Sequence, residues 1–333
     1  MIGVIGAGSW GTALSIVLAN NSSLEFVPLW SNDPQQLVEM QEQRKNSRYL
    51  PAIELPGKIV FFEHLSDLLA KVQDIMLVVP SHAFAMVIRQ IKPYINTNHR
   101  IAWATKGIDP TTGKFFSELV QDELGQDRAC AVLSGPSFAY EVACGLPTAV
   151  TVAVNDQDFM QDMVSYFHVN NFRIYTSTDL IGVQLGGVIK NIFAVAAGIA
   201  DGLGFGANAR AALITRGLVE MQRLGKQLGV IPETLTGLAG LVDMILTCTD
   251  NQSRNRRFGL ALADGKTVDE AQHDIKQVVE AVHNTAKICE KALELGVEMP
   301  IVNQVDLILK NKITPQQAVH NLITRKPAQE IRA

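Results

Sequence analysis

The chain has 333 residues, and 29 lysines and arginines against 33 aspartates and glutamates give it a net charge of −4. This mildly acidic charge makes nucleic acids and anionic membranes poor candidates as partners, and a hydrophobic share of 47% argues against disorder. The length favours about two domains, and no apolar run approaches the roughly 20 residues of a membrane span.

The first half of the chain alternates strand and helix signals. Segments 12–20 and 82–91 have helical periodicity and lie between short apolar runs that are typical of buried strands. The runs span residues 2–5, 26–30, 59–62, 75–79, 101–104, 130–133, 148–154 and 172–175. This alternation predicts an α/β, Rossmann-like domain over residues 1–179, with a mostly parallel, doubly wound sheet.

The second half of the chain has no convincing strand signal. Thr267 and Thr314, each followed three residues later by a glutamate or glutamine, are typical helix starts, and Gly229 can end a helix. The pattern predicts an all-α substrate and catalytic domain over residues 180–333. The apolar residues Leu213, Leu218, Met221, Leu224 and Leu228 fall close to one face of a predicted helix in this domain.

Gly6, Gly8 and Gly11 form a G-x-G-x-x-G motif between a strand signal and a helix signal. One glycine makes a tight turn, one lets the backbone approach a pyrophosphate, and one lets the helix pack closely on the strand. The pyrophosphate then lies at the helix N-terminus, where free N–H groups favour an anion. The motif predicts a dinucleotide site, with a glycine-rich turn that binds no ligand as the alternative.

The end of the second predicted strand leaves the choice between NAD and NADP open. Ser31 and Asn32 are neutral, and Asp33 can either hold the ribose hydroxyls or begin a turn or helix, since Pro34 follows it. No arginine for a 2′-phosphate occurs within residues 30–33.

Lys190 interrupts an otherwise apolar helix signal. A poorly solvated lysine has a lowered pKa, and a second cation lowers it further, so Lys190 is a candidate general base. Lys106, at the carboxyl end of a predicted strand, is the candidate second cation. The alternatives are a Lys190 that extends to the surface and a Lys106 that is an ordinary loop lysine.

Residues 253–257 form a short basic cluster, in which Arg254 and Asn255 at a helix start can bind a phosphate. A solvated basic face is the alternative, and the lack of interleaved aromatic residues disfavours nucleic acid. Asp243 is expected either to orient a substrate hydroxyl or the lysine, or to cap a helix.

The four cysteines contain no C-x-x-C spacing, so we expect reduced thiols in a cytoplasmic protein, without a disulfide framework or a metal site. They are Cys130, Cys144, Cys248 and Cys289. The N-terminus has no basic region before its apolar run, so no signal peptide is expected.

Six segments together resemble the bacterial NAD(P)-dependent sn-glycerol-3-phosphate dehydrogenases almost end to end. They are GAGSWGTAL (6–14), ATKG (104–107), SGPSFA (134–139), LGGVIKN (185–191), GANARAALITRG (206–217) and LTCTDNQSRNRRFG (246–259). The resemblance implies hydride transfer between sn-glycerol 3-phosphate and dihydroxyacetone phosphate with NAD or NADP, supplying glycerol 3-phosphate for phospholipid synthesis. It also implies a cytoplasmic homodimer.

The resemblance further implies roles for single residues. Lys190 is the catalytic lysine that exchanges a proton with the C2 oxygen, and Lys106 contacts both substrate and cofactor. The implied substrate-binding residues are Lys106, Gly135, Ser137, Lys190, Asp243, Ser253, Arg254 and Asn255, the last pair near the phosphate. The implied cofactor-binding residues are Gly6, Gly8, Ser9, Trp10, Gly11, Tyr49, Lys106, Ala139, Arg254, Val278 and Glu280.

Two positions depart from the family pattern. Asn32 stands where the family often has arginine or histidine, and Val242 stands where a glycine commonly precedes the substrate aspartate. Because valine restricts the backbone, we expect Asp243 to shift slightly. Two rival functions remain: another two-domain hydroxyacid or sugar-acid dehydrogenase, and a non-catalytic dinucleotide sensor.

Overall fold

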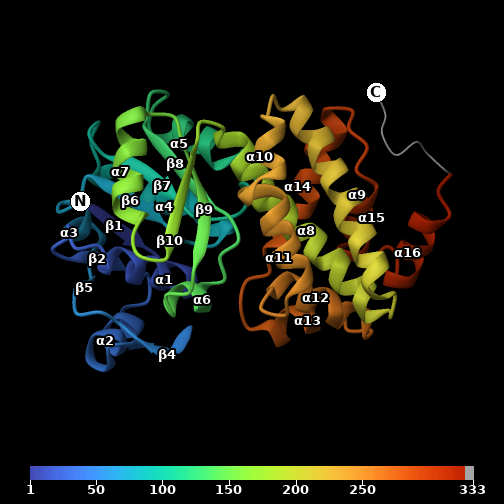
Figure 1. The fold of residues 1–333 in the computed structure, drawn as a ribbon, viewed down its shortest axis with the longest axis horizontal. Helices are drawn as coiled ribbons and strands as arrows, with labels where there is room; N and C mark the ends of the chain where they lie inside the picture. Colours follow the sequence, from blue (N-terminus) through green and yellow to red (C-terminus); the bar gives the residue numbers. More distant parts are fainter. Residues whose placement is uncertain (327–333) are drawn as a thin grey trace.

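The computed structural model describes residues 1–326, with the strands in the first part of the chain and helices alone after them in this range (Figure 1). The strands are β1 (Ile2–Ile5), β2 (Val27–Trp30), β3 (Lys45–Asn46), β4 (Leu50–Glu54), β5 (Ile59–Phe62), β6 (Asp74–Leu77), β7 (Arg100–Trp103), β8 (Cys130–Ser134), β9 (Thr148–Val154) and β10 (Phe172–Ser177).

Helices flank the sheet and then make up the second part of the chain. The first seven are α1 (Ser9–Ala19), α2 (Pro34–Gln43), α3 (Leu65–Leu69), α4 (Ser81–Ile91), α5 (Phe116–Leu124), α6 (Ala139–Ala143) and α7 (Gln157–Phe167). The others are α8 (Leu180–Gly202), α9 (Gly206–Gln227), α10 (Pro232–Thr236), α11 (Asp243–Thr249), α12 (Arg254–Ala263), α13 (Val268–Ile275), α14 (Glu280–Glu294), α15 (Pro300–Leu309) and α16 (Pro315–Ile323). Two short turns of other helix types are η1 (Lys92–Tyr94) and the π-helical η2 (Leu238–Val242).

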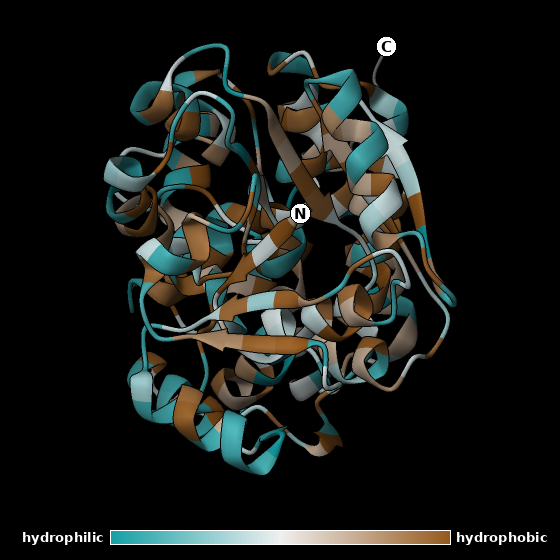
Figure 2. Cartoon of the chain, turned by 90° about the vertical axis from the view of Figure 1, so that its left-hand side faces the viewer, coloured by the Kyte–Doolittle hydropathy of each residue, from teal (hydrophilic) through white to brown (hydrophobic). Residues whose placement is uncertain are grey.

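Eight strands form one sheet in the order β10-β9-β8-β7-β6-β1-β2-β5, in which every neighbouring pair is parallel except β8 and β9. The central strands are buried throughout and mostly apolar (Figure 2) because helices cover both faces of a parallel sheet. The predicted Rossmann-like class with a helical second part is therefore confirmed. All eight expected strands form, but the β3–β4 hairpin was not predicted.

Helix α8 is the centre of the helical part and packs against α9, α11, α12, α14 and α15. It crosses α12 in close contact: a Cβ atom on Gly198 would lie 2.1 Å from the Arg256 carbonyl oxygen, and one on Gly259 would lie 2.2 Å from that of Val195. Only glycine at both positions lets the two backbones approach this closely.

Helix α8 also corrects the expectation that no segment is long enough to cross a membrane. Among the described residues it alone reaches the length and hydropathy of a spanning helix, but 89% of its most apolar window is buried inside the protein. Polar residues such as Lys190 interrupt its apolar run, which is why the run looked short in the sequence. Its burial marks α8 as a core helix.

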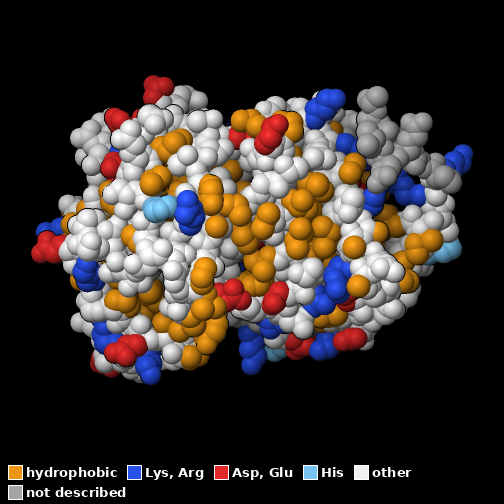
Figure 3. Space-filling model, viewed as in Figure 1, with side chains coloured by type: hydrophobic (Ala, Val, Ile, Leu, Met, Phe, Trp, Pro, Cys, Tyr) orange, Lys and Arg blue, Asp and Glu red, His pale blue; other side chains and the backbone are white. Residues whose placement is uncertain are grey.

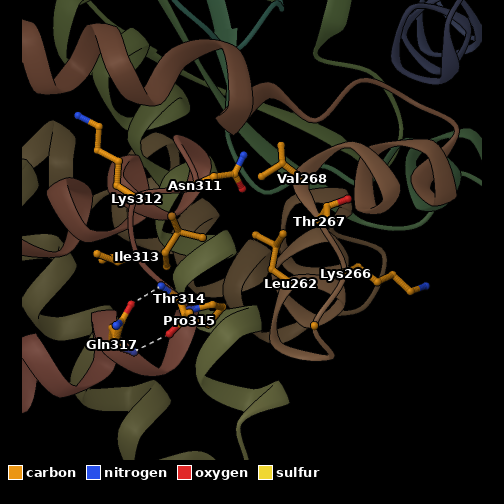
Figure 4. A pocket seen from close by; sticks show the side chains of 12 residues that line it. Leu262, Lys266, Thr267, Val268, Asn311, Lys312, Ile313, Thr314, Pro315 and Gln317 are labelled. Carbon is orange, nitrogen blue, oxygen red and sulfur yellow. Dashed lines mark hydrogen bonds between the residues drawn. The ribbon is translucent and has the colours of Figure 1, made fainter.

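The expected helix starts are present. Thr267 caps α13 and Thr314 caps α16, and each exchanges hydrogen bonds with the residue three positions later. Gly229 takes a φ of +70° two residues after α9 ends. These two capped N-termini line a pocket of about 310 Å³ (Figure 4), in which none of the predicted site residues takes part.

Candidate functional site

The glycine motif forms the turn between β1 and α1, and each glycine has a separate structural reason. Gly6 has a φ of +115°, and a Cβ atom there would lie 2.3 Å from the Val78 carbonyl oxygen. A Cβ atom on Gly11 would lie 1.8 Å from the Gly6 carbonyl oxygen, so Gly11 lets α1 pack on the strand end. Gly8, by contrast, has no atom near its missing Cβ, which leaves its face open.

The open face of this turn fits the pyrophosphate of a dinucleotide. Gly8 is the N-cap of α1, and no side chain caps the helix, so its first N–H groups are free to bind an anion. Ser9 and Trp10 begin the helix, and the buried Trp10 indole N–H has no hydrogen-bond partner among the described residues. Trp10 and Ala139 pack against the same core beside the turn.

The end of β2 shows which of its two expected roles Asp33 takes in this structure. Asp33 caps α2 by accepting the Gln36 N–H at 3.1 Å, and its other oxygen pairs with Arg48 at 2.8 Å. Ser31 is buried and donates to Gln36, whereas Asn32 is exposed. Asp33 therefore begins a helix, and both of its oxygens already have partners.

Lys106, Lys190 and Asp243 meet where the sheet part contacts the helical part. Lys106 follows β7, Lys190 lies in α8, and Asp243 begins α11. Asp243 accepts from Lys190 at 2.6 Å and from Lys106 at 2.8 Å, one lysine on each carboxylate oxygen. The Asp243 side chain is 1% exposed, so the structure buries two cations around one anion.

The Lys190 side chain stays inside the protein and does not extend to the surface. It is 9% exposed, and burial lowers the pKa of Lys190 to about 7. The Lys106 charge lowers this pKa as well, whereas Asp243 raises it. The amine therefore changes its protonation state near neutral pH, as a general acid and base must.

One ammonium hydrogen stays available on each lysine. An ammonium group has three N–H donors. Lys190 uses one on Asp243 and one on Thr247, at 3.0 Å, and Lys106 uses one on Asp243 and one on the Gly135 carbonyl, at 2.9 Å. Two lysines with one free donor each can bind the same oxygen atom of a substrate.

The β8 end forms a loop beside these lysines. Gly135 has a φ of +149°, and a Cβ atom there would lie 3.0 Å from the Val150 Cα atom, so a larger residue would disturb β9. The Ser137 hydroxyl donates to the Gly135 carbonyl at 2.9 Å. This carbonyl thus orients Lys106 and Ser137 together.

The basic cluster at the start of α12 separates into residues with different surroundings. Arg254 is accessible to solvent, with Glu280 and Tyr49 close enough to act on its charge. Ser253 caps α12 by accepting the Arg256 N–H at 3.2 Å. Arg256 is buried and pairs with Asp201 in α8 at 2.6 Å, so this arginine of the cluster points into the protein.

Asn255 is buried and links α12 to α8 and α14. It donates to Asn191 at 2.9 Å and accepts the Ala281 N–H at 3.2 Å, which leaves one amide hydrogen for a ligand. The hydrogen bond between Asn255 and Asn191 therefore connects the residue after Arg254 to the residue after Lys190.

Three further predicted cofactor residues, Glu280, Val278 and Tyr49, lie at the start of α14, just before it and in the β3–β4 hairpin. Glu280 accepts from the Ser81 backbone at 3.2 Å and from its hydroxyl, so it joins α14 to the N-terminus of α4. Val278 and Tyr49 are half-buried, and Tyr49 lies in the β3–β4 hairpin. Among the described residues, no hydrogen bond joins Val278 to Lys106 or Lys190.

The sequence interpretation missed Thr247 and Asn191. Thr247 lies four residues after Asp243, one helical turn away on the same face, and this spacing is the signal that would have found it. Val242 has a φ of −67° and a ψ of −44°, ordinary helical angles that valine adopts, and Asp243 contacts both lysines. The slight shift of Asp243 relative to the family stays a prediction.

Within residues 1–326, no group of three or more histidine, cysteine, aspartate or glutamate side chains is placed to hold a metal ion. The four cysteines are unpaired in the same range.

Comparisons with known proteins give a consistent result. Two family models match, described as the N-terminus and the C-terminus of NAD-dependent glycerol-3-phosphate dehydrogenase, over residues 1–160 and 179–320. A relative from Haemophilus ducreyi, "Glycerol-3-phosphate dehydrogenase [NAD(P)+]", is 50% identical over 99% of this chain and 98% of its own. A protein of the same name from Psychromonas ingrahamii has the same identity and coverage. A crystal structure of glycerol-3-phosphate dehydrogenase from Coxiella burnetii is 50% identical, with a TM-score of 0.93 over 97% of this chain and 98% of that chain.

Proposed function

The chain belongs to the family of NAD-dependent glycerol-3-phosphate dehydrogenases, and from this premise we propose that Lys190, Asp243 and Lys106 are its catalytic centre. The protein is an oxidoreductase that interconverts sn-glycerol 3-phosphate and dihydroxyacetone phosphate with NAD(P)(H). The observation that supports the assignment is the pair of buried lysines on one aspartate, each with a free N–H donor.

In this proposal the chain's residues manage the charge and the proton at the C2 oxygen. A bound nicotinamide supplies or accepts the hydride. In the reducing direction Lys190 donates a proton to the C2 oxygen, and Lys106 stabilises the negative charge that develops there. Because the pKa of Lys190 is about 7, the same amine takes the proton back in the oxidising direction. Asp243 holds both ammonium groups in place.

The substrate phosphate lies at the start of α12 in this proposal. Arg254 and the free amide hydrogen of Asn255 bind it, together with the N–H groups of the first turn that the Ser253 cap leaves free. Gly135, Ser137 and Ser253 line the remaining contacts. Binding energy from the unreactive phosphate then positions the carbonyl against Lys190.

Arg254→Ala tests the phosphate assignment. Dihydroxyacetone phosphate and unphosphorylated dihydroxyacetone are compared by absorbance of the reduced nicotinamide. We expect the variant to lower kcat/KM for the phosphorylated substrate about 100-fold, because a charge-assisted contact is lost, and to change the other substrate little. Arg257→Ala, the exposed neighbour, is the matched control. Equal losses on both substrates would contradict the phosphate role.

Residues 1–179 are the proposed dinucleotide-binding domain and residues 180–333 the proposed substrate and catalytic domain, of which 327–333 lie outside the described range, and each domain also contributes contacts to the other's ligand. The pyrophosphate lies at the open face of Gly8 and the free N–H groups of α1. The other proposed cofactor contacts are Gly6, Ser9, Trp10, Gly11, Tyr49, Lys106, Ala139, Arg254, Val278 and Glu280.

A cytoplasmic homodimer is the last part of the proposal. Hydrophobic side chains gather over the middle of one face, around α9, α10 and α11 (Figure 3). Ile231, Val242 and Ile245 are exposed on or next to these helices. A patch of this kind favours a self-association surface.

Sedimentation should give about twice the 36.3 kDa chain mass. Ile231→Asp should lower the measured mass to that of the monomer, whereas Ile323→Asp, at an exposed position on α16, should leave it unchanged. A wild-type monomer would refute it.

A further inference from the structure

We propose that Arg48, from the β3–β4 hairpin, binds the 2′-phosphate of NADPH and so sets the cofactor preference of this enzyme. The inference rests on the proposed dehydrogenase function and deepens it. Enzymes that bind dinucleotides on a parallel sheet distinguish NAD from NADP near the end of the second strand. An acidic residue there binds the ribose 2′-hydroxyl of NAD, or an arginine binds the 2′-phosphate of NADP. Residues 30–33, at the end of β2, contain no arginine.

The structure brings an arginine to this place from another element. The Arg48 guanidinium lies 2.8 Å from the Asp33 carboxylate, three residues after the end of β2. The Arg48 side chain is 52% exposed and gives one donor to Asp33, so a ligand can reach the guanidinium from solvent. The planar guanidinium group of arginine binds both carboxylates and phosphates through its forked N–H donors. In Arg48, Asp33 occupies one side of this fork.

The hairpin that carries Arg48 is tied directly to the dinucleotide turn. Asn46 is fully buried and donates to the carbonyl of Ala7, at 2.9 Å, and to the Thr12 hydroxyl, at 2.8 Å. Ala7 lies between Gly6 and Gly8 of the glycine motif. The hairpin is therefore anchored to the dinucleotide turn two residues before Arg48.

Asp33 is poorly suited to hold the ribose hydroxyls itself. One of its oxygens caps α2 through the Gln36 N–H, and the other pairs with Arg48. These contacts hold the pKa of Asp33 below its usual value, so the carboxylate stays charged and repels a 2′-phosphate. Arg48 thus attracts the phosphate while Asp33 moderates its affinity, and the two residues tune the NADPH-to-NADH ratio in opposite directions.

The test compares Arg48→Ala and Asp33→Asn in the full-length enzyme, using NADH and NADPH with dihydroxyacetone phosphate. We expect Arg48→Ala to lower the ratio of kcat/KM for NADPH over NADH by about 10-fold or more, through KM. Asp33→Asn should raise that ratio about 3-fold or more, because a negative charge is lost while asparagine still caps α2. Arg89→Ala, which breaks an exposed pair with Glu123 between α4 and α5, is the matched control and should leave the ratio unchanged.

An unchanged ratio in Arg48→Ala would overturn the inference, and an unchanged ratio with equal losses for both cofactors would indicate a purely structural hairpin contact. Binding of adenosine 2′,5′-bisphosphate and of adenosine 5′-monophosphate, measured by calorimetry, separates this inference from the proposed function. If wild-type protein turned over neither cofactor, the proposed function would fail. In that case, a loss of binding in Arg48→Ala that affects the bisphosphate but not the monophosphate would still support a 2′-phosphate contact by Arg48. Unchanged bisphosphate binding would refute it.

Discussion

Lys190→Ala should lower kcat for dihydroxyacetone phosphate reduction by about 10²- to 10⁴-fold, the range that general acid–base catalysis contributes. The variant removes the buried amine whose pKa is about 7, while Asp243 keeps Lys106 as its partner. Steady-state rates at saturating substrate and cofactor measure the effect. Binding of the reduced cofactor, followed by fluorescence, should be retained.

The pH profile gives this prediction a definite sign. In wild type the reducing direction needs protonated Lys190, so its rate should fall as the pH rises through about 7. The oxidising direction needs the neutral amine, so its rate should rise over the same range. Lys58→Ala, which removes a lysine that donates within residues 1–326 only to the Asn21 and Leu24 carbonyls, serves as the control and should keep both pH profiles. A near-wild-type rate in Lys190→Ala would remove Lys190 from the mechanism.

Asp243→Asn should have the second large effect, on both catalysis and stability. The amide leaves Lys106 and Lys190 without the buried anion that holds them, and breaking a buried ion pair costs about 3 kcal/mol, near the low end of the usual range because Lys190 can lose its proton. Because Asp243 raises the pKa of Lys190, its removal should also move the oxidation profile to lower pH. We expect kcat to fall about 100-fold, since both donors lose their orientation.

Asp201→Asn is the matched control for this variant. Asp201 is also a nearly buried aspartate between two cations, Arg210 at 2.8 Å and Arg256 at 2.6 Å. Chemical denaturation should show a loss of stability in both variants, whereas the pH profile should move only in Asp243→Asn. If both profiles moved alike, or neither did, Asp243 would have no specific action on Lys190.

Much of the fold was predictable because it depends on local patterns. Buried parallel strands require continuous apolar runs, and the eight runs of the first part became the eight strands of the main sheet. Likewise, Thr267 and Thr314 could be predicted as helix N-caps because each partner in the capping box lies only three residues later. The β3–β4 hairpin was missed because β3 is only two polar residues long and a proline interrupts the apolar residues of β4, so neither gives a strand signal.

The candidate site was predictable only as a set of residue types. Lys190 stood out as a charge in an apolar helix, but its partner Asp243 lies 53 residues away, and no local pattern encodes that contact. Glu280 shows the same limit more strongly, because it bonds to Ser81 across 199 residues. Asp33 was ambiguous in the sequence because helix capping and ribose binding both use an aspartate at that position.

The glycine contact between α8 and α12 has a consequence for how specificity is divided in this enzyme. Gly198 and Gly259 lock the two helices together, and the Asn191–Asn255 bond links the neighbours of Lys190 and Arg254. In the proposed site, the distance from the phosphate end to the reacting end of the substrate is thus set within the helical part. Cofactor choice, in the inference above, is determined in the sheet part, at β2 and the β3–β4 hairpin. Mutations can therefore alter which nicotinamide nucleotide is used without changing which carbon chain is accepted.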